Sequence, residues 1–369
     1  MNISTKKIDL IVGARPNFMK VASLFLAKRM SGNATSKFEF RLVHTGQHYD
    51  PRMSGTFFEQ LGIPHPDVNL EVGSGTQAEQ TAGIMIGYEK LLQQNPPDLC
   101  IVVGDVTSTM ACTITAQKQG VKVGHIEAGI RSMDCSMPEE INRMVTDSIS
   151  DYFFTTSETA NQNLHSLGIS KDRIFFVGNT MIDTLLHHID RVRCPDFWQD
   201  FELAVKSYFV LTLHRPTNVD QTDDFHDLLQ AIGDSARELP VIFPVHPRSA
   251  KKLTEMGGIP SNIILVEPQP YLEFTYLVKN AKAVITDSGG ITEEATVMDV
   301  PCMTLRDSTE RPETISIGTN ELVGTKPQAL KPFMDKLFAG NWKRGGIPEK
   351  WDGQAGKRIL MHLEKILHS

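Results

Sequence analysis

Three acidic residues in the first half of the chain, Asp105, Glu127 and Glu139, have the chemistry and the positions of proton-transfer groups. Asp105 and Glu127 each come directly after a short apolar run, and Glu139 lies at the start of a helical segment. Carboxylates that converge on one cleft repel each other, which suits groups that must exchange protons. Arg131 and Arg143 are close enough in the sequence to balance these charges. We therefore expect an acid–base role for at least one of the three carboxylates.

Two of these carboxylates also fit ordinary structural roles. Asp is a preferred N-cap, so Asp105 could cap the helix that we expect from Thr107. Glu139 follows Pro138 at an expected helix start, where acidic residues are favoured because they face the positive end of the helix dipole. The pattern alone leaves these roles open beside the catalytic one.

A second group of residues is suited to binding an anion. Arg15 and Lys20 lie near the start of an expected helix, where two cations are unfavourable unless an anion such as phosphate is bound. Solvated surface charges are the alternative for this pair. His214 and His246 follow expected strands in the second half, and an arginine lies beside each. Such a pair can stabilise or protonate an anionic leaving group.

The segment 286–294 carries the sharpest single motif, because an expected strand delivers Ser288, Gly289 and Gly290 to the start of a helix. The bare amides and the dipole at that helix end favour phosphate, and glycine lets a diphosphate approach the backbone closely. Glu294 falls in the first turn of the expected helix, placed to accept hydrogen bonds from sugar hydroxyls. This pattern favours a nucleoside diphosphate site.

Several function classes are excluded by what the sequence lacks. The first strand is not followed by Gly-x-Gly-x-x-Gly, and neither a Walker A loop nor His-Glu-x-x-His occurs, so we expect no nicotinamide cofactor, NTP hydrolysis or catalytic metal. The 37 Lys and Arg against 44 Asp and Glu give a net charge of −7, which disfavours a nucleic-acid partner. No apolar run approaches the ~20 residues of a membrane span. Five scattered cysteines and a charged N-terminus indicate the cytoplasm.

The elements that must position these residues alternate between short apolar strands and longer helices, which predicts an α/β protein with doubly wound parallel sheets. Expected strands are 8–12, 38–44, 99–104, 121–126, 152–156 and 174–178, then 208–213, 241–245, 263–266, 283–286 and 302–305. An irregular aromatic stretch near residue 193 separates the two series, and 369 residues suit two domains.

We therefore expect two Rossmann-like domains that face a central cleft. Residues 1–180 form the domain with the carboxylates, residues 181–352 form the domain that binds the nucleotide, and residues 353–369 form a final helix that could pack on either domain. Ligands of open α/β sheets bind beyond the carboxyl ends of the strands, where the candidate residues lie.

These residues, in this order, resemble the non-hydrolysing UDP-N-acetylglucosamine 2-epimerases, which have the two-domain GT-B fold. The resemblance runs nearly end to end. It rests on the motifs GARPxxxK (13–20), TGQH (45–48), GD (104–105), HxEAGxR (125–131), PEExNR (138–143), GNT (178–180), HR (214–215), PVHP (244–247), TDSGG (286–290), ERPE (310–313) and DGxAxxRI (352–359).

The resemblance implies that UDP-GlcNAc and UDP-ManNAc are interconverted by inversion at C2 of the sugar. Members of the family eliminate UDP to give a bound 2-acetamidoglucal and then add UDP back. The catalytic positions of the family match Asp105, Glu127, Glu139 and His214. Its binding positions match Arg15, Lys20, Arg143, His246, Gln269, Phe274, Ser288, Gly289, Gly290, Glu294 and Arg311. Of these, Glu294 corresponds to a ribose contact, and Gln269 and Phe274 correspond to the uracil pocket. Without the resemblance, Phe274 reads as a core aromatic residue.

The chain departs from the family in two places. Many members have Glu where this chain has Thr217, and allosterically activated bacterial members carry a basic residue in the loop that here spans 71–77, although Gln47 and His48 are present. We therefore do not expect activation by UDP-GlcNAc at a second site. The family also implies a homodimer, closure of the domains over the substrate and a role in polysaccharide precursor synthesis.

Other functions stay open on the same residues. A hydrolysing relative would release ManNAc and UDP, and related epimerases act on UDP-2,3-diacetamido-uronic acids. Those epimerases carry tryptophan where this chain has Arg311, which favours the GlcNAc substrate. A GT-B glycosyltransferase and an inactive UDP-sugar binding module are alternatives of a different class, and the intact set of carboxylates argues against the binding module.

Overall fold

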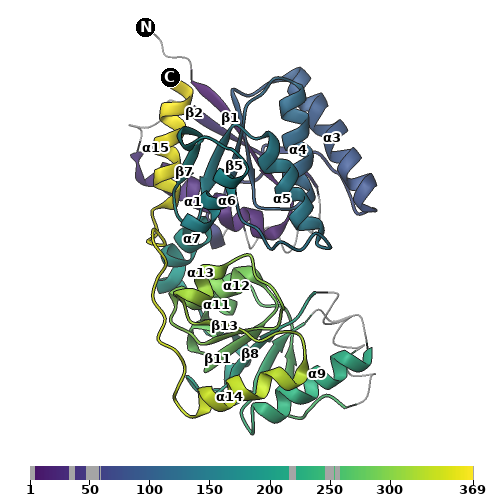
Figure 1. The fold of residues 1–369 in the computed structure, drawn as a ribbon, viewed down its shortest axis with the longest axis vertical. Helices are drawn as coiled ribbons and strands as arrows, with labels where there is room; N and C mark the ends of the chain where they lie inside the picture. Colours follow the sequence, from purple (N-terminus) through teal and green to yellow (C-terminus); the bar gives the residue numbers. More distant parts are fainter. Residues whose placement is uncertain are drawn as a thin grey trace. The chain divides into compact units, whose positions relative to one another are not determined.

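Two compact units make up the chain, one from residues 1–187 and 349–369 and the other from residues 188–348. The structure is a computed structural model, and it describes residues 5–32, 38–46, 58, 60–215, 222–245, 253 and 258–368. Each unit has its own parallel sheet (Figure 1). The predicted pair of parallel α/β domains is confirmed.

The first unit is built on a seven-stranded sheet in the order β3-β2-β1-β4-β5-β6-β7, in which every pair is parallel. Its central strands are buried along their whole length, as strands covered by helices on both faces must be. The strands are β1 (Lys6–Val12), β2 (Phe38–His44), β3 (Val68–Asn69), β4 (Leu99–Val103), β5 (Val123–Ile126), β6 (Tyr152–Thr155) and β7 (Ile174–Phe176).

Helices follow most of these strands and cover the sheet. On one side α3, α4 and α5 lie next to one another (Figure 1). Helix α3 begins with a capping box, in which Thr76 and Glu79 each accept a hydrogen bond from the backbone N–H of the other. The helices are α1 (Arg15–Met30), α3 (Gln77–Gln94), α4 (Thr107–Lys118), α5 (Pro138–Ile149), α6 (Glu158–Ser166), α7 (Thr180–His188) and α15 (Ala355–His368), with the short η2 (Lys171–Arg173).

The end of the chain returns to the first unit, where α15 packs against α1 (Figure 1). Asp183 on α7 accepts hydrogen bonds from the backbone N–H groups of Ala355 (3.0 Å) and Gly356 (2.7 Å), which satisfies two donors at the start of α15. The buried indole of Trp351 donates to the carbonyl of Thr156. The structure therefore places the divisions at residues 187 and 348, where the sequence suggested 180 and 352.

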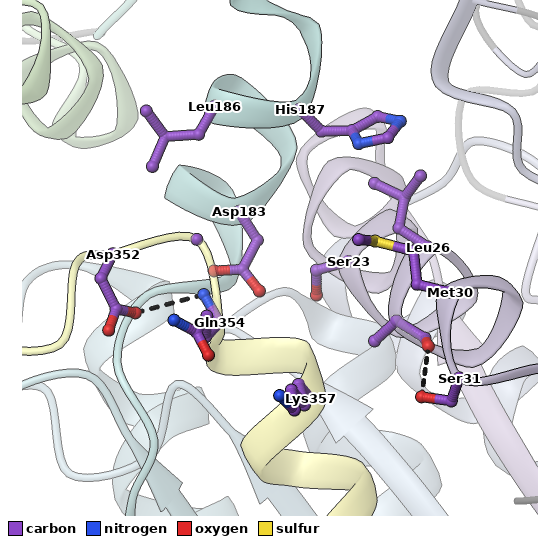
Figure 2. A pocket seen from close by; sticks show the side chains of 12 residues that line it. Ser23, Leu26, Met30, Ser31, Asp183, Leu186, His187, Asp352, Gln354 and Lys357 are labelled. Atoms are coloured by element: carbon purple, nitrogen blue, oxygen red, sulfur yellow. Dashed lines mark hydrogen bonds between the residues drawn. The ribbon is translucent and has the colours of Figure 1, made fainter.

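A cavity of about 590 Å³ lies within the first unit beside the start of α15. Figure 2 shows Asp183 at one side of it, with Leu26 and Met30 of α1 opposite. Burial raises the pKa of Asp183 to about 6, although the two backbone donors lower it. The residues that the sequence singled out for catalysis or binding do not line this cavity.

The second unit has a six-stranded parallel sheet in the order β10-β9-β8-β11-β12-β13. Alternate residues point to opposite faces, so that Phe209 and Leu211 join one hydrophobic cluster while Tyr208 and Val210 join another. The strands are β8 (Phe209–Thr212), β9 (Val241–Pro244), β10 (Ile263–Val266), β11 (Ala283–Thr286), β12 (Cys302–Thr304) and β13 (Asn320–Leu322).

The helices of the second unit are α9 (Thr222–Ser235), α11 (Tyr271–Asn280), α12 (Gly289–Val297), α13 (Pro312–Ser316) and α14 (Leu330–Phe338). The irregular aromatic stretch contains one short 3-10 helix, η4 (Asp196–Trp198), and another, η3 (Ile189–Arg191), precedes it. A third, η5 (Pro327–Ala329), precedes α14. Among all described residues, no helix is both long enough and apolar enough to cross a membrane.

Candidate active site

The first unit brings Asp105 and Glu127 to one edge of its sheet. They follow β4 and β5, which are parallel neighbours paired from Cys100 with Val123 to Val103 with Ile126. Gly104 has a φ of 70°, and a Cβ at that position would lie 2.9 Å from Lys20 Nζ and 3.2 Å from Glu127 Oε2. Only glycine therefore fits this turn without displacing the two charged side chains.

Both carboxylates are paired with a cation. The buried ammonium of Lys20 forms an ion pair with Glu127, and the guanidinium of Arg143 forms one with Asp105. Arg143 also binds Glu140 at 2.9 Å, and Asn142 donates to the carbonyl of Asp105 at 2.8 Å. Lys20, which the sequence suggested for phosphate, is thus a partner of a carboxylate here. Asp105 does not cap α4, because Val106 is the N-cap residue.

Glu139 differs from the other two carboxylates. It is the second residue of α5 and is exposed, and its side chain has no hydrogen bond or ion pair with a described residue. Arg131, expected to balance the three carboxylates, instead binds the buried Asp147 at 2.7 Å, because the turn after β5 directs it toward α5.

In the second unit, His214 and Asp287 form a pair at the ends of adjacent strands. β8 and β11 are in register at Thr212 and Thr286. The buried Asp287 lies 2.7 Å from His214 Nδ1 and also accepts from the backbone N–H groups of His214 and Arg215 at 3.0 and 2.9 Å. The contact with Asp287 fixes the orientation of the His214 ring. The side chain is nevertheless 61% exposed, so the other edge of the ring faces solvent. The strand alignment is the signal that could have identified Asp287 as its partner.

The start of α12 has the features of a phosphate site. Ser288 is the N-cap, but its side chain does not cap the helix, and its backbone N–H donates to Thr286 Oγ1 at 2.9 Å. A Cβ on Gly289 would meet Glu310 no closer than 3.6 Å, so packing does not require glycine there. Gly290 follows as the second helical residue. The absence of side chains leaves the amides accessible to an anion.

Arg306 is a neighbour of this helix start that the sequence did not single out. Its guanidinium is buried, binds Glu310 at 2.6 Å, and has Nη1 4.0 Å from a Cβ built on Gly289. That Nη1 has no hydrogen-bond partner among the described residues. The one feature of the sequence that could have identified Arg306 is its position just after β12, at the same edge of the sheet as Ser288 and His214.

Glu294 lies in the second turn of α12 and not in the first, because the helix begins at Gly289 and a turn contains about 3.6 residues. It is buried and accepts from the hydroxyl of Tyr271 at 3.0 Å. Burial raises the pKa of Glu294 to about 7; the Tyr271 hydrogen bond opposes this rise, and the charge of Glu293 adds to it.

The remaining candidates have mixed surroundings. Gln269 donates to the carbonyl of Glu267 at 2.8 Å, and the half-buried Phe274 packs against the hydrophobic cluster of α11, as a core aromatic residue would. Arg311 is buried and paired with Glu293. His246, Thr217, Gln47, His48 and the side chain of Arg15 lie outside the described residues. Within the described ranges, no cluster of three His, Cys, Asp or Glu is arranged to hold a metal ion.

Comparisons with known proteins identify the family. The model of the UDP-N-acetylglucosamine 2-epimerase family matches residues 31–364. The UDP-N-acetylglucosamine 2-epimerase of Methanocaldococcus jannaschii is 39% identical over 97% of this chain and 98% of that protein. The UDP-2,3-diacetamido-2,3-dideoxy-D-glucuronate 2-epimerase of Pseudomonas aeruginosa is 36% identical over 98% of this chain and 100% of that protein.

Solved structures agree. The crystal structure of the Methanocaldococcus jannaschii UDP-GlcNAc 2-epimerase in complex with UDP-GlcNAc and UDP has a TM-score of 0.85 at 38% identity, covering 97% of this chain and 99% of that one. Motifs, fold and relatives therefore lead to the same conclusion, that this chain belongs to the UDP-N-acetylglucosamine 2-epimerase family.

Proposed function

We propose that this protein interconverts UDP-GlcNAc and UDP-ManNAc by eliminating UDP and adding it back with C2 inverted. The observation that carries the proposal is the pair Asp105 and Glu127 at adjacent strand ends, each held by a buried cation. A proton on C2 of a sugar is not acidic enough for simple removal, so its loss must be coupled to departure of the diphosphate from C1.

In the first step a carboxylate takes the C2 proton while the bond between C1 and the diphosphate oxygen breaks. A double bond forms between C1 and C2, which gives 2-acetamidoglucal and UDP. In the second step a carboxylate returns a proton to the opposite face of C2, and the diphosphate oxygen bonds to C1 again. The carboxylate that accepts the proton releases it to water, and the one that donates is reprotonated by water, so all other atoms come from the substrate and the proposal includes no cofactor.

The second unit supplies the groups that suit the departing diphosphate. The backbone amides of Gly289 and Gly290, with the hydroxyl of Ser288, are the proposed donors to the negative charge that develops on the leaving group. His214, oriented by Asp287, can donate a proton or a hydrogen bond to the same group. Glu294 is the proposed ribose contact, and Gln269, Phe274 and Arg311 are the proposed contacts of the remaining nucleotide.

We further propose that the protein acts in the cytoplasm as a homodimer and that its two domains close over the substrate. We propose that its product is used to make cell-surface polysaccharide precursors. The five cysteines are free thiols, as a reducing compartment requires. The other points rest on the family resemblance, and gel filtration with light scattering tests the dimer directly.

Proton NMR in D₂O tests the reaction. Purified protein is mixed with UDP-GlcNAc without added metal or cofactor, and we expect UDP-GlcNAc and UDP-ManNAc that both gain deuterium at C2. Free ManNAc with UDP would instead identify a hydrolysing enzyme. An unchanged spectrum would contradict the proposed substrate. A matched sample with Glu127→Gln controls for contaminating epimerase.

A second candidate substrate is UDP-2,3-diacetamido-glucuronate, because a relative named for that substrate is 36% identical over the whole of its length. The two sugars differ at C3 and C6 and share the reacting C1–C2 bond. We favour GlcNAc because Arg311 occupies the position at which the uronate enzymes carry tryptophan. Measurement of kcat/KM for both sugars decides between them, and a higher value for the uronate would reverse the assignment.

A further inference from the structure

His125 is a histidine that the proposed reaction does not use. It lies in β5 two residues before Glu127 and is fully buried. Its Nδ1 is 2.7 Å from Asp147 Oδ1, and its Nε2 is 2.8 Å from the carbonyl oxygen of Gly104. A carbonyl oxygen can only accept a hydrogen bond, so Nε2 must carry a hydrogen.

The partner on the other side of the ring is also an acceptor. Asp147 Oδ2 is held by Arg131 Nη1 at 2.7 Å and by the backbone N–H of Gly129 at 3.1 Å. The guanidinium of Arg131 is a cation in direct contact with this buried carboxyl, and an opposite charge at that distance favours the ionised form of an acid. The carboxyl is therefore ionised, and the hydrogen in the 2.7 Å contact must belong to His125 Nδ1.

We propose that His125 is a buried imidazolium that positions the catalytic carboxylates. It joins three parts of the first unit: β5, which leads to Glu127; the Gly104 turn, which leads to Asp105; and α5, which carries Asp147 together with Glu139. The protonation of the ring stands on hydrogen-bond geometry alone, whereas its consequence for catalysis rests on the proposed function.

The charges around the ring explain why a cation is tolerated in the core. His125 and Arg131 are cations and Asp147 is an anion, so the buried cluster carries a net positive charge. Burial of a single unpaired cation would be costly, and here the shared carboxylate offsets much of that cost. The excess positive charge lies beneath a sheet edge whose carboxylates, Asp105 and Glu127, must be anions before they can accept a proton.

Nitrogen NMR tests the protonation without any assay of activity. Protein labelled with ¹⁵N-histidine is measured at about pH 8, above the ordinary pKa of a histidine side chain of about 6.5. The His125 signals are assigned by their loss in His125→Gln. We expect both ring nitrogens to have the shifts and one-bond couplings of an imidazolium. A ring with one unprotonated nitrogen would overturn the proposal.

Kinetics of two variants test the positioning role. In His125→Phe both donors are lost, and we expect kcat to fall about 10²-fold, because misplacement by about 1 Å costs that much. KM and the affinity for UDP should stay within about twofold. In Asp147→Asn the remaining oxygen can still accept from Arg131 and Gly129, so the ring should become neutral while keeping its Nε2–H bond to Gly104. We expect kcat to fall less than about tenfold there.

The controls separate this inference from the proposed function. His165→Gln alters a half-buried histidine of the same unit and should keep the wild-type kcat. Circular dichroism establishes that each variant is folded, and His125→Gln replaces His125→Phe if the latter is not. A folded His125 variant with the wild-type kcat would overturn the positioning role. An inactive wild-type protein with an imidazolium signal would contradict only the proposed function.

Discussion

At the scale of single residues, the candidate carboxylates are not equivalent. Asp105 and Glu127 each form an ion pair with a buried cation, Arg143 and Lys20 respectively. Glu139 is exposed and its side chain has no hydrogen bond or ion pair with a described residue. A reaction that inverts one carbon needs a proton acceptor on one face of that carbon and a proton donor on the other. Carboxyl groups with different surroundings, some ion-paired and one exposed, are suited to these two different roles.

Neutral isosteres of the carboxylates give the most direct test of this division. Asp105→Asn, Glu127→Gln and Glu139→Gln should each lower kcat by at least about 10²-fold, the range of general acid–base catalysis. UDP affinity, measured by calorimetry, should change less than about threefold, because the proposed phosphate contacts lie elsewhere. Glu158→Gln, an exposed glutamate of α6, is the matched control. A variant with the wild-type rate would remove that residue from the mechanism.

We expect Glu294, the proposed ribose contact, to make binding of the nucleoside depend on pH. Its pKa of about 7 is raised above the ordinary value, so lowering the pH through 7 protonates the folded protein. The ionised carboxylate is the form that accepts two hydrogen bonds from a ribose. Uridine, which lacks phosphate, should therefore bind more tightly as the pH rises from about 6 to about 8, by up to about tenfold.

Ligand-observed NMR titration of uridine measures this dependence, and Glu294→Gln supplies the comparison. The glutamine variant should bind more weakly, with an affinity that does not change over the same range. Equal pH dependence in both proteins would show that another group controls binding. The same raised pKa predicts that Glu294 lowers the stability of the folded unit as the pH rises from about 4.5 toward 7, since the unfolded chain releases this proton first.

At the scale of elements, the sequence predicted most of what positions the site. Apolar runs separated by helices identify parallel strands, and candidates that follow strands must gather at one sheet edge, as Asp105 and Glu127 do. The sequence does not predict the strands β3 (Val-Asn) and β13 (Asn-Glu-Leu), because each contains one apolar residue and leaves no apolar run, whereas β7 (Ile-Phe-Phe), which is as short as β13, does leave one. Partners such as Lys20 for Glu127 depend on tertiary packing, which spacing along the chain does not encode.

The contact of α15 with α1 is a further case that only the structure reveals. A Cβ on Gly356 would lie 2.5 Å from the backbone oxygen of Ser23 on α1, so alanine there must push the two helices apart. We expect Gly356→Ala to cost about 1–3 kcal/mol of stability, the usual penalty of overpacking. Hydrogen exchange of the α15 amides should accelerate accordingly.

Gly73→Ala is the matched control for that substitution, because no atom lies within 4 Å of its added Cβ and its backbone is not in the left-handed region. Its hydrogen-exchange pattern over α15 should equal that of the wild type. Unchanged protection of α15 in Gly356→Ala would show that α1 and α15 can separate without loss of stability.

At the scale of the whole molecule, the three candidate carboxylates lie in one unit and most of the proposed nucleotide contacts lie in the other. Asp105, Glu127 and Glu139 belong to the first unit, and the proposed nucleotide contacts from His214 to Arg311 belong to the second. The second unit is also one continuous segment with its own hydrophobic clusters, whereas the first unit needs two segments of the chain. This division predicts that binding of the nucleotide and chemistry on the sugar can be separated.

A fragment of residues 188–348 tests that separation. We expect it to fold, because its sheet and both hydrophobic clusters are complete, and to bind UDP through Ser288, Gly289 and Gly290. It should neither epimerise UDP-GlcNAc nor exchange its C2 proton in D₂O, since it lacks all three carboxylates. Calorimetry with UDP and proton NMR measure the two properties. A folded fragment that fails to bind UDP would show that cations of the first unit, such as Arg15, are indispensable for the nucleotide, whereas C2 exchange by the fragment would contradict the assignment of the carboxylates.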